Sequence, residues 1–152
     1  MSTQGLEGLE HTVQVTHAWI NELDRRLQWD NKGRSYRLLK AVLHALRDSL
    51  RVNEVVDLGA QLPTLLRGAY YEQWQPSKAP AKGRSIEQFI ESVNGSFQRD
   101  PLEDSAKAIM AVFQLLTTKV TEGEIEDVRR GLPESLRTIW PASSRAPGTV
   151  RH

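Results

Sequence analysis

The chain resembles itself when it is shifted by 70 residues. Residues 19–71 align without a gap on residues 89–141 and share 13 identical residues in 53 positions. Unrelated sequences would share about three, since each common residue makes up well under a tenth of a chain. The identical pairs are Ile20/Ile90, Gln28/Gln98, Asp30/Asp100, Ser35/Ser105, Ala41/Ala111, Val42/Val112, Leu46/Leu116, Glu54/Glu124, Asp57/Asp127, Leu62/Leu132, Pro63/Pro133, Leu66/Leu136 and Arg67/Arg137. The sequence therefore predicts an internal duplication.

Each half of the predicted repeat has the apolar spacing of four helices. In the first half, helices are predicted over residues 11–29, 36–50 and 54–61, and Pro63 opens a fourth. The second half contains three helix-start motifs, which are Ser85-x-x-Gln88, Asp100-Pro-Leu-Glu103 and Thr121-x-x-Glu124. No alternating run is typical of a strand. We therefore expect an all-α bundle of two pseudo-symmetric four-helix repeats, about eight helices in total, with Asp30 and Asp100 as helix N-caps.

Composition suggests how these helices are organised. Prolines, lysines and a glycine mark residues 75–83 as a linker, so one helical domain over residues 11–141 is expected to contain halves at 11–74 and 84–141. Residues 1–10 and the tail at 142–152 are expected to be disordered.

Charge and cysteine content limit the class of protein. Apolar residues make up 39% of the chain, enough for a core, and the net charge is only +1. No apolar run approaches the roughly 18 residues needed to span a bilayer, and the start has no pattern of a secretory signal. The absence of cysteine excludes disulfides and thiolate chemistry and agrees with a reducing compartment. We expect a cytoplasmic protein with no membrane association.

Residues suited to catalysis or metal binding are few. The four histidines, at 11, 17, 44 and 152, form no metal-ligand motif, and His44 is expected to be solvated. The acidic run from Glu122 to Asp127 lacks the spacing of a calcium loop and suits a helix start. There is no glycine-rich phosphate loop. We therefore expect no catalytic residues, no metal and no cofactor, and interpret the chain as not an enzyme.

Two charged sets occur in both halves at matching positions. Glu54 and Asp57 precede Arg67 as Glu124 and Asp127 precede Arg137. A catalytic site is seldom built twice from the same residues, so we interpret these six as structural ion pairs that hold the third helix of each half to the fourth.

Basic residues gather locally. Residues 25–51 contain eight basic and two acidic side chains, and Arg37, Lys40, Arg47 and Arg51 lie near one another on the helical pattern. A basic helix face can bind phosphates, although a nucleic-acid binder usually has a positive balance over the whole domain. A solvated polar face is the alternative.

Two aromatic residues have no apolar counterpart in the repeat. Tyr71 and Trp74 lie in "YYEQW", just before the linker, and Tyr71 aligns with Pro141. They pack over the seam between the halves, or they contact a partner, since tyrosine and tryptophan are enriched at binding hot spots.

Several stretches resemble a known family. The segment "LLKAVLHALRDSLRVNEVVDLGAQLPTLLRGAYYEQWQP", with "RSIEQFIESV" and the closing "EIEDVRRGLPESLRTIWP", is similar to the bacterial domain of unknown function 2267. The resemblance covers about residues 11–141 and departs from the family pattern at Gln73, where a glycine is usual. It implies a small helical bacterial protein and no established activity.

These observations favour a non-enzymatic protein–protein interaction or scaffold domain of the bacterial cytoplasm, with an unknown protein partner or self-association. Tyr71 and Trp74 are its expected contact residues. One alternative is a nucleic-acid-binding regulator that uses the basic face. Another is an enzyme or small-ligand binder with a cleft between the halves.

Overall fold

The computed structural model describes residues 3–78 and 85–141, and these ranges contain α-helices, two short 3-10 helices and no strand. The prediction of an all-α fold of about eight helices is confirmed. The α-helices are α1 (Thr3–Leu27), α2 (Lys32–Ser49), α3 (Val52–Ala60), α4 (Thr64–Tyr71), α5 (Ile86–Asn94), α6 (Ser105–Lys119), α7 (Glu122–Gly131) and α8 (Glu134–Arg137). The 3-10 helices span Pro76–Lys78 and Gly95–Phe97.

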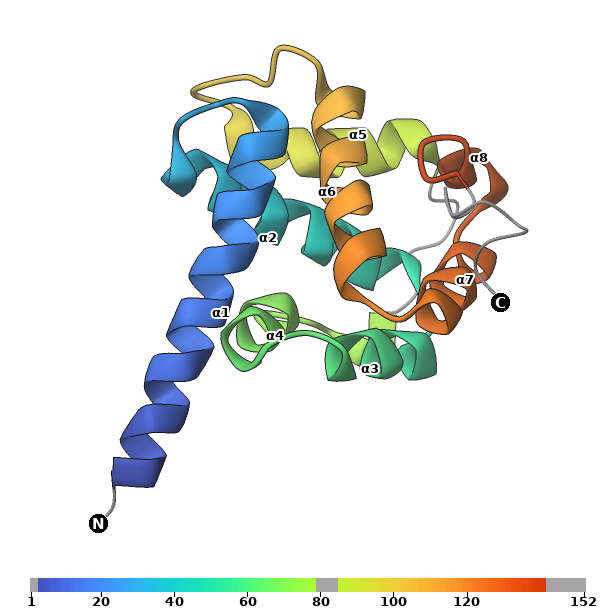
Figure 1. Ribbon diagram of the computed structural model, residues 1–152. Helices are drawn as coiled ribbons and strands as arrows, with labels where there is room; N and C mark the ends of the chain where they lie inside the picture. The colour runs from blue at the N-terminus through green and yellow to red at the C-terminus, as the bar shows by residue number, and fades with distance from the viewer. Residues whose placement is uncertain (1–2, 79–84, 142–152) are drawn as a thin grey trace, which may run out of the picture.

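Helix α2 lies at the centre of the molecule. It packs against α1, α4, α5 and α6, and Leu39, Val42 and Leu46 are fully buried in it. Helix α6 crosses beside α1 and α5 (Figure 1), so the second segment of the chain, residues 85–141, shares one hydrophobic core with the first segment, residues 3–78. Helices α3 and α7 also contact each other. The duplication itself stays a prediction.

Some predicted helix starts are wrong. Helix α2 is capped by Asn31, which accepts the N–H of Arg34, and α6 is capped by Asp104, which accepts the N–H of Lys107. Asp30 instead has a positive φ of 52° before the helix, and Asp100 lies five residues ahead of α6. The capping box of Ser85 and Gln88 is confirmed by its two reciprocal hydrogen bonds.

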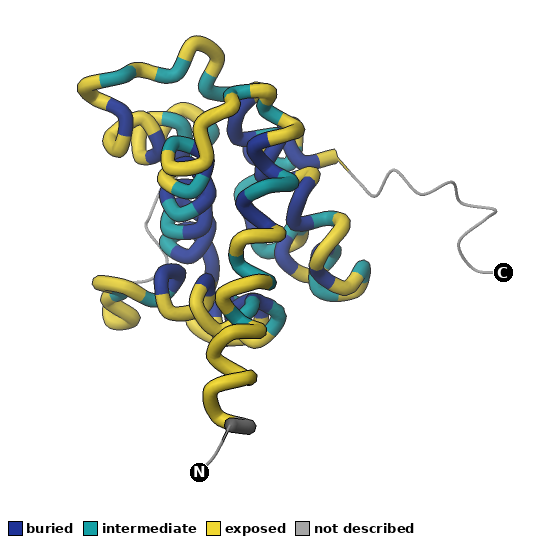
Figure 2. Tube along the Cα trace, turned by 60° about the vertical axis from the view of Figure 1, so that its left-hand side comes forward, coloured by how far each residue is buried: buried dark blue, intermediate teal, exposed yellow. Residues whose placement is uncertain are grey.

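The beginning of α1 differs most from expectation. Residues 1–10 were predicted to be disordered, yet α1 begins at Thr3, because a helix already anchored on the core extends more easily than it starts. Residues 5–11 are all exposed, and this part of α1 projects from the body (Figures 1 and 2). Residues 5–13 are called the α1 arm below.

The connection between the two segments is described only in part. Within the predicted linker, Pro76–Lys78 forms a 3-10 turn, while residues 79–84 and the predicted tail at 142–152 lie outside the described residues. In the described part of the chain, no helix combines the length and hydropathy needed to cross a membrane.

Candidate interaction surface

The α1 arm carries the most exposed large apolar side chains among the described residues. Leu6 and Leu9 are each 62% exposed and Val13 is 43% exposed. They begin a series with alternating spacings of three and four that continues along α1 with Thr16, Ile20, Leu23 and Leu27. This is the spacing of one helix-packing face. The later members of the series pack on the body, so the arm extends the same face beyond it.

A second exposed apolar patch lies on α3. Val52 and Val56 are 43% and 48% exposed, and a spacing of four residues places them on the same side of the helix. Arg51 precedes them, is exposed, and has no ion-pair partner among the described residues. On α4, Leu65 is also exposed, at 46%.

The two aromatic residues expected to contact a partner are half-buried. Tyr71 and Trp74 pack against the core, with 5.6 Å between their ring centroids. Tyr71 also meets the ring of Tyr70, at 4.9 Å, and its ring lies over Gly59 of α3. A Cβ atom on Gly59 would lie 2.9 Å from Cζ of Tyr71, so the ring occupies space that only glycine leaves open. These contacts lie within the first segment, and both side chains stay partly exposed, so their contact with a partner stays a prediction.

The basic face is not a free cationic surface. Arg47 is only 5% exposed, because it turns inward and donates to the carbonyl oxygens of Tyr70 and Glu72 at 2.8 and 2.7 Å. Lys40 pairs with Glu72 at 3.0 Å.

Arg37 is engaged by the second segment of the chain. It pairs with Asp100 at 2.7 Å and lies over the ring of Phe97. The pair raises the pKa of Arg37 and lowers the pKa of Asp100. Of the four predicted phosphate-binding residues, Arg51 alone is exposed and without such a contact among the described residues.

The six predicted ion-pair residues are arranged differently from the expectation, because unpaired carbonyl groups at a helix end attract the arginines. Arg67 donates to the carbonyl oxygens of Gly59 and Leu62 at 2.8 and 2.9 Å, at the end of α3. Arg137 donates to those of Arg130 and Leu132 at the end of α7, at 2.9 and 3.1 Å. Neither arginine forms an ion pair with Glu54, Asp57, Glu124 or Asp127 in the described part of the chain, and Asp127 pairs with Arg130.

The four carboxylates of this set gather instead where α3 meets α7. Burial, followed by the charges of Asp57, Asp127 and Glu54, raises the pKa of Glu124 to about 7. Gly131 lets α7 approach α3, since a Cβ there would lie 2.6 Å from Oε1 of Glu54. Within the described residues, no three histidine or carboxylate side chains are placed to hold a metal ion.

His44 is part of a clamp from α2 onto the end of α4, which corrects the expectation of a solvated side chain. Its Nε2–H donates to the carbonyl oxygen of Ala69 at 2.6 Å, between the contacts that Lys40 and Arg47 make with the same helix end. Burial lowers the pKa of His44, and the hydrogen bond opposes that shift only in part.

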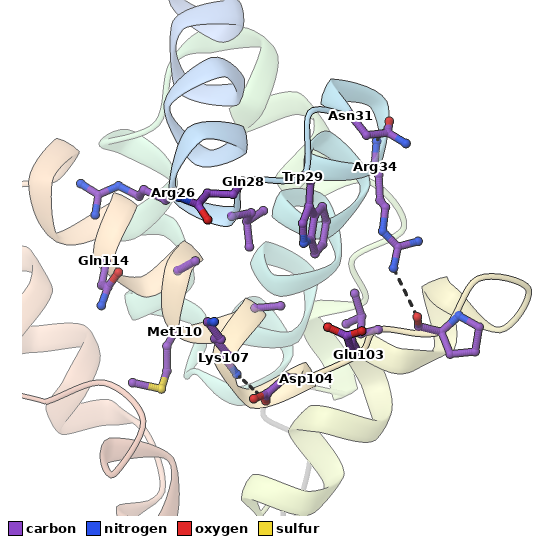
Figure 3. A pocket seen from close by; sticks show the side chains of 15 residues that line it. Arg26, Gln28, Trp29, Asn31, Arg34, Glu103, Asp104, Lys107, Met110 and Gln114 are labelled. Atoms are coloured by element: carbon purple, nitrogen blue, oxygen red, sulfur yellow. Dashed lines mark hydrogen bonds between the residues drawn. The ribbon is translucent and has the colours of Figure 1, made fainter.

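An open hollow of about 810 Å³ is lined by residues 26–34 of the first segment and residues 101–114 of the second (Figure 3). Trp29, Leu102 and Met110 are among its lining residues, and Trp29 stands between Gln28 and Asp30, which both have positive φ. Arg34 bridges one side to Pro101 at 3.3 Å. Glu103, Asp104 and Lys107 also line the hollow, and Asp104 accepts the backbone N–H of Lys107 at 3.0 Å as the cap of α6.

Leu6, Leu9 and Val13 are not among the contact residues predicted from the sequence. Their spacing was a readable signal, because it continues the apolar series of α1, which only Thr16 interrupts. Gly5 and Gly8 obscured that signal, since each glycine in a helix costs about 1 kcal/mol relative to alanine.

Residues 16–139 match the model of the family described as "Uncharacterized conserved protein (DUF2267)", and the α1 arm precedes this match. No curated protein matches the sequence. Since the match spans most of the chain, the protein belongs to the DUF2267 family.

Proposed function

We propose that this chain is a non-enzymatic protein-interaction domain whose contact surface is the α1 arm. The observation that carries the proposal is the exposure of Leu6, Leu9 and Val13 on a helix that projects from the body (Figure 2). Scattered single apolar residues are ordinary on a protein surface, whereas a contiguous apolar patch is usually a binding site.

Energetics support a partner for the arm. Burying an exposed leucine side chain stabilises a complex by about 1.5–3 kcal/mol. An isolated helical end of this length with two glycines is only marginally stable in water. Contact with a partner would therefore both remove apolar surface from water and hold the arm in its helical form.

The other candidate surfaces give less support to the alternatives. Nucleic-acid binding relied on four basic residues, of which Arg47 is buried and Arg37 and Lys40 are already paired with carboxylates. Pairing inside the protein removes the charge that phosphate binding requires.

Ligand binding in the hollow around Trp29 is a second candidate. It is favoured by the backbone on both sides of Trp29, since non-glycine residues with positive φ are uncommon and gather at functional sites. Nuclear magnetic resonance titration with a library of small amphipathic compounds tests it. Shifts confined to the Trp29 indole and Met110 methyl signals would support the site, and their absence for every compound would remove it.

The interaction proposal is tested with a tagged chain and its Leu6→Ser/Leu9→Ser variant in pull-down experiments from native cells. We expect a stoichiometric protein that is retained by the wild type and lost in the variant. Gln14→Ser, an exposed polar change on the same helix, is the matched control and should retain that protein. Equal melting temperatures for the three chains confirm that the body is intact. Retention of every partner by the double variant would overturn the proposal.

A further inference from the structure

We propose that the contact between α3 and α7 is a pH-sensitive latch, which holds the two segments of the chain together in weakly acidic solution and loosens in alkaline solution. Loosening separates α3 from α7 as a local opening under native conditions, while α2, α5 and α6 stay packed on one another. The inference goes beyond the proposed function and does not depend on it, because it uses neither the α1 arm nor its partner.

The two helices of the latch lie side by side and run antiparallel (Figure 1). The side-chain oxygen of Gln61, at the end of α3, accepts the backbone N–H of Thr121, just before α7, at 3.2 Å. At the other end, the carboxylate of Glu54, in the first turn of α3, lies against Gly131, the last residue of α7. Both helices also bury apolar side chains in the shared core, which are Val55 and Leu58 on α3 and Ile125 and Val128 on α7.

Like charges meet across this contact. Burial of Glu124 and the charges of Asp57, Asp127 and Glu54 together raise the pKa of Glu124 to about 7. The carboxylate of Glu54 also lies at the end of α7 where the unpaired carbonyl groups carry partial negative charge, which does not stabilise an anion. Among the described residues, Glu54, Asp57 and Glu124 have no ion-pair partner. The closed latch therefore favours a proton on Glu124.

The cations nearest the latch do not pair with Glu124. Arg51 and Arg130 line an open hollow of about 380 Å³ together with Glu54, Asp57 and Asp127, and Glu124 is not among the residues that line it. Arg130 pairs with Asp127. These two arginines therefore offset the charges of the outer carboxylates and leave Glu124 without a cation.

The other charged or titratable groups on the elements around the latch already have contacts of their own. Arg67 of α4 and Arg137 of α8 donate to backbone carbonyl oxygens, Arg129 pairs with Glu126, Lys119 of α6 pairs with Glu22, and the hydroxyl of Tyr70 donates to the carbonyl oxygen of Val55. Glu122 adds a further carboxylate in the first turn of α7. No cation in this part of the described chain is placed to replace the proton on Glu124 when the pH rises.

Opening of the latch is linked to release of this proton. Separation of the helices returns Glu124 to water, where a glutamate has a pKa near 4.5, so the open form binds fewer protons between pH 4.5 and 7. A rise in pH through this range therefore favours the open form. We expect the open population to rise roughly tenfold between pH 5 and pH 8, less than the full shift would give, because Glu124 is partly exposed.

The absence of cysteine from the chain lets a single introduced thiol report the opening. Val128→Cys places the thiol at a fully buried position of α7, and Val93→Cys is the matched control, equally buried on α5, which packs on α2 and α6. The rate of labelling by a thiol reagent is divided by the rate for the same variant unfolded in urea at the same pH, which removes the pH dependence of the thiol itself. The ratio for Val128→Cys should rise roughly tenfold between pH 5 and pH 8, and the ratio for Val93→Cys should change far less. Equal rises at both positions would show a general loss of stability and overturn the latch.

Substitutions of the carboxylates separate the latch from other causes of a pH effect. Glu124→Gln, combined with Val128→Cys, should remove the rise, and Asp57→Asn, a change at an exposed position, should reduce it by lowering the pKa of Glu124. Glu87→Gln, an exposed change on α5, should leave it intact. Val55→Cys on α3 is a second reporter, should Val128→Cys fail to fold, and is expected to give the same profile. A ratio that does not change with pH, or one that rises as steeply with Glu124→Gln as without it, would overturn the proposal.

Discussion

Glu124 is a half-buried carboxylate that faces Glu54, Asp57 and Asp127 where α3 meets α7. Its pKa is raised from 4.5 to about 7, so the folded chain binds more protons than the unfolded chain between these values. The stability that this residue contributes is therefore fully present below pH 4.5 and is lost as the pH rises through 7.

Replacing this carboxylate should stabilise the protein at alkaline pH. We expect Glu124→Gln to raise the free energy of unfolding at pH 8 by roughly 1 kcal/mol, a value reduced from the full shift because the group is partly exposed. Below pH 4.5 the variant and the wild type should be equally stable. Urea unfolding at pH 4.5 and pH 8 measures both, with Glu87→Gln on α5 as the exposed control. Equal effects at the two pH values would contradict the raised pKa.

His44 should have the opposite dependence on pH. Its lowered pKa means that the folded chain holds the ring neutral, so stability is present above the ordinary value of 6.5 and is lost as the pH falls below it. We expect His44→Gln to keep a donor to Ala69 and to remove this loss. Between pH 7 and 5, the free energy of unfolding of the variant should rise on acidification, because the protonation of Glu124 then sets its pH dependence. Thermal melts at pH 5, 6 and 7 measure the slope, and a steeper loss of stability in the variant would contradict the assignment.

The ring of Tyr71 packs so closely on Gly59 that a side chain at position 59 would collide with it. We expect Gly59→Ala to cost roughly 1–3 kcal/mol, because the added Cβ collides with the Tyr71 ring. With Tyr71→Ala present, the same change should cost less, because only Cε2 of the buried Tyr70, at 3.1 Å, still crowds the added Cβ. A double-mutant cycle by urea unfolding measures the coupling. Equal costs in both backgrounds would show that the ring does not set the requirement for glycine.

Single residues were the hardest to predict from the sequence. The repeat correctly marked Arg67 and Arg137 as performing equivalent roles, but their charge suggested carboxylate partners, and the structure gives them carbonyl groups. A pattern of charges does not reveal which unpaired backbone groups lie nearby. For the same reason Arg47, in an apparently polar row of α2, proved to be buried.

At the scale of elements, the helix stability of the α1 arm affects how tightly the arm binds a partner. Gly5 and Gly8 have nothing within 4 Å of an added Cβ, so alanine fits at both positions. We expect Gly5→Ala/Gly8→Ala to increase the helicity of the arm and to tighten its binding by about threefold to tenfold, because less order must be gained on contact. Circular dichroism and sedimentation velocity measure the two effects. Higher helicity with weaker binding would mean that the partner needs the glycines for close approach.

Most helices could be predicted from apolar spacing, and their ends could not. The central helix, α2, was predicted over 36–50 and spans Lys32–Ser49. The true caps, Asn31 and Asp104, follow the predicted ones at Asp30 and Asp100, because several residues before each helix can accept an N–H. The arm was not predicted, because its two glycines have a low helix propensity, although its apolar spacing is typical of a helix.

At the scale of the whole molecule, both segments share one core, so the body is expected to unfold as a unit while the arm responds separately. The candidate surface follows from this arrangement. Leu6, Leu9 and Val13 are exposed only because α1 is longer than the body that it packs against (Figure 1). The sequence could supply their spacing, but the place where the body ends is set by tertiary packing.

Hydrogen–deuterium exchange of the wild-type chain at low and high protein concentration tests the central claim most directly. The amides of residues 7–13 have helical hydrogen bonds, but the side chains around them are mostly exposed, so they should exchange quickly in the monomer. We predict that exchange in the α1 arm slows at high concentration or on addition of the protein recovered by pull-down, and that exchange in α5 and α6 is unchanged. Exchange in the arm that stays fast at every concentration, and also in the presence of any protein recovered by pull-down, would contradict its role as the contact surface.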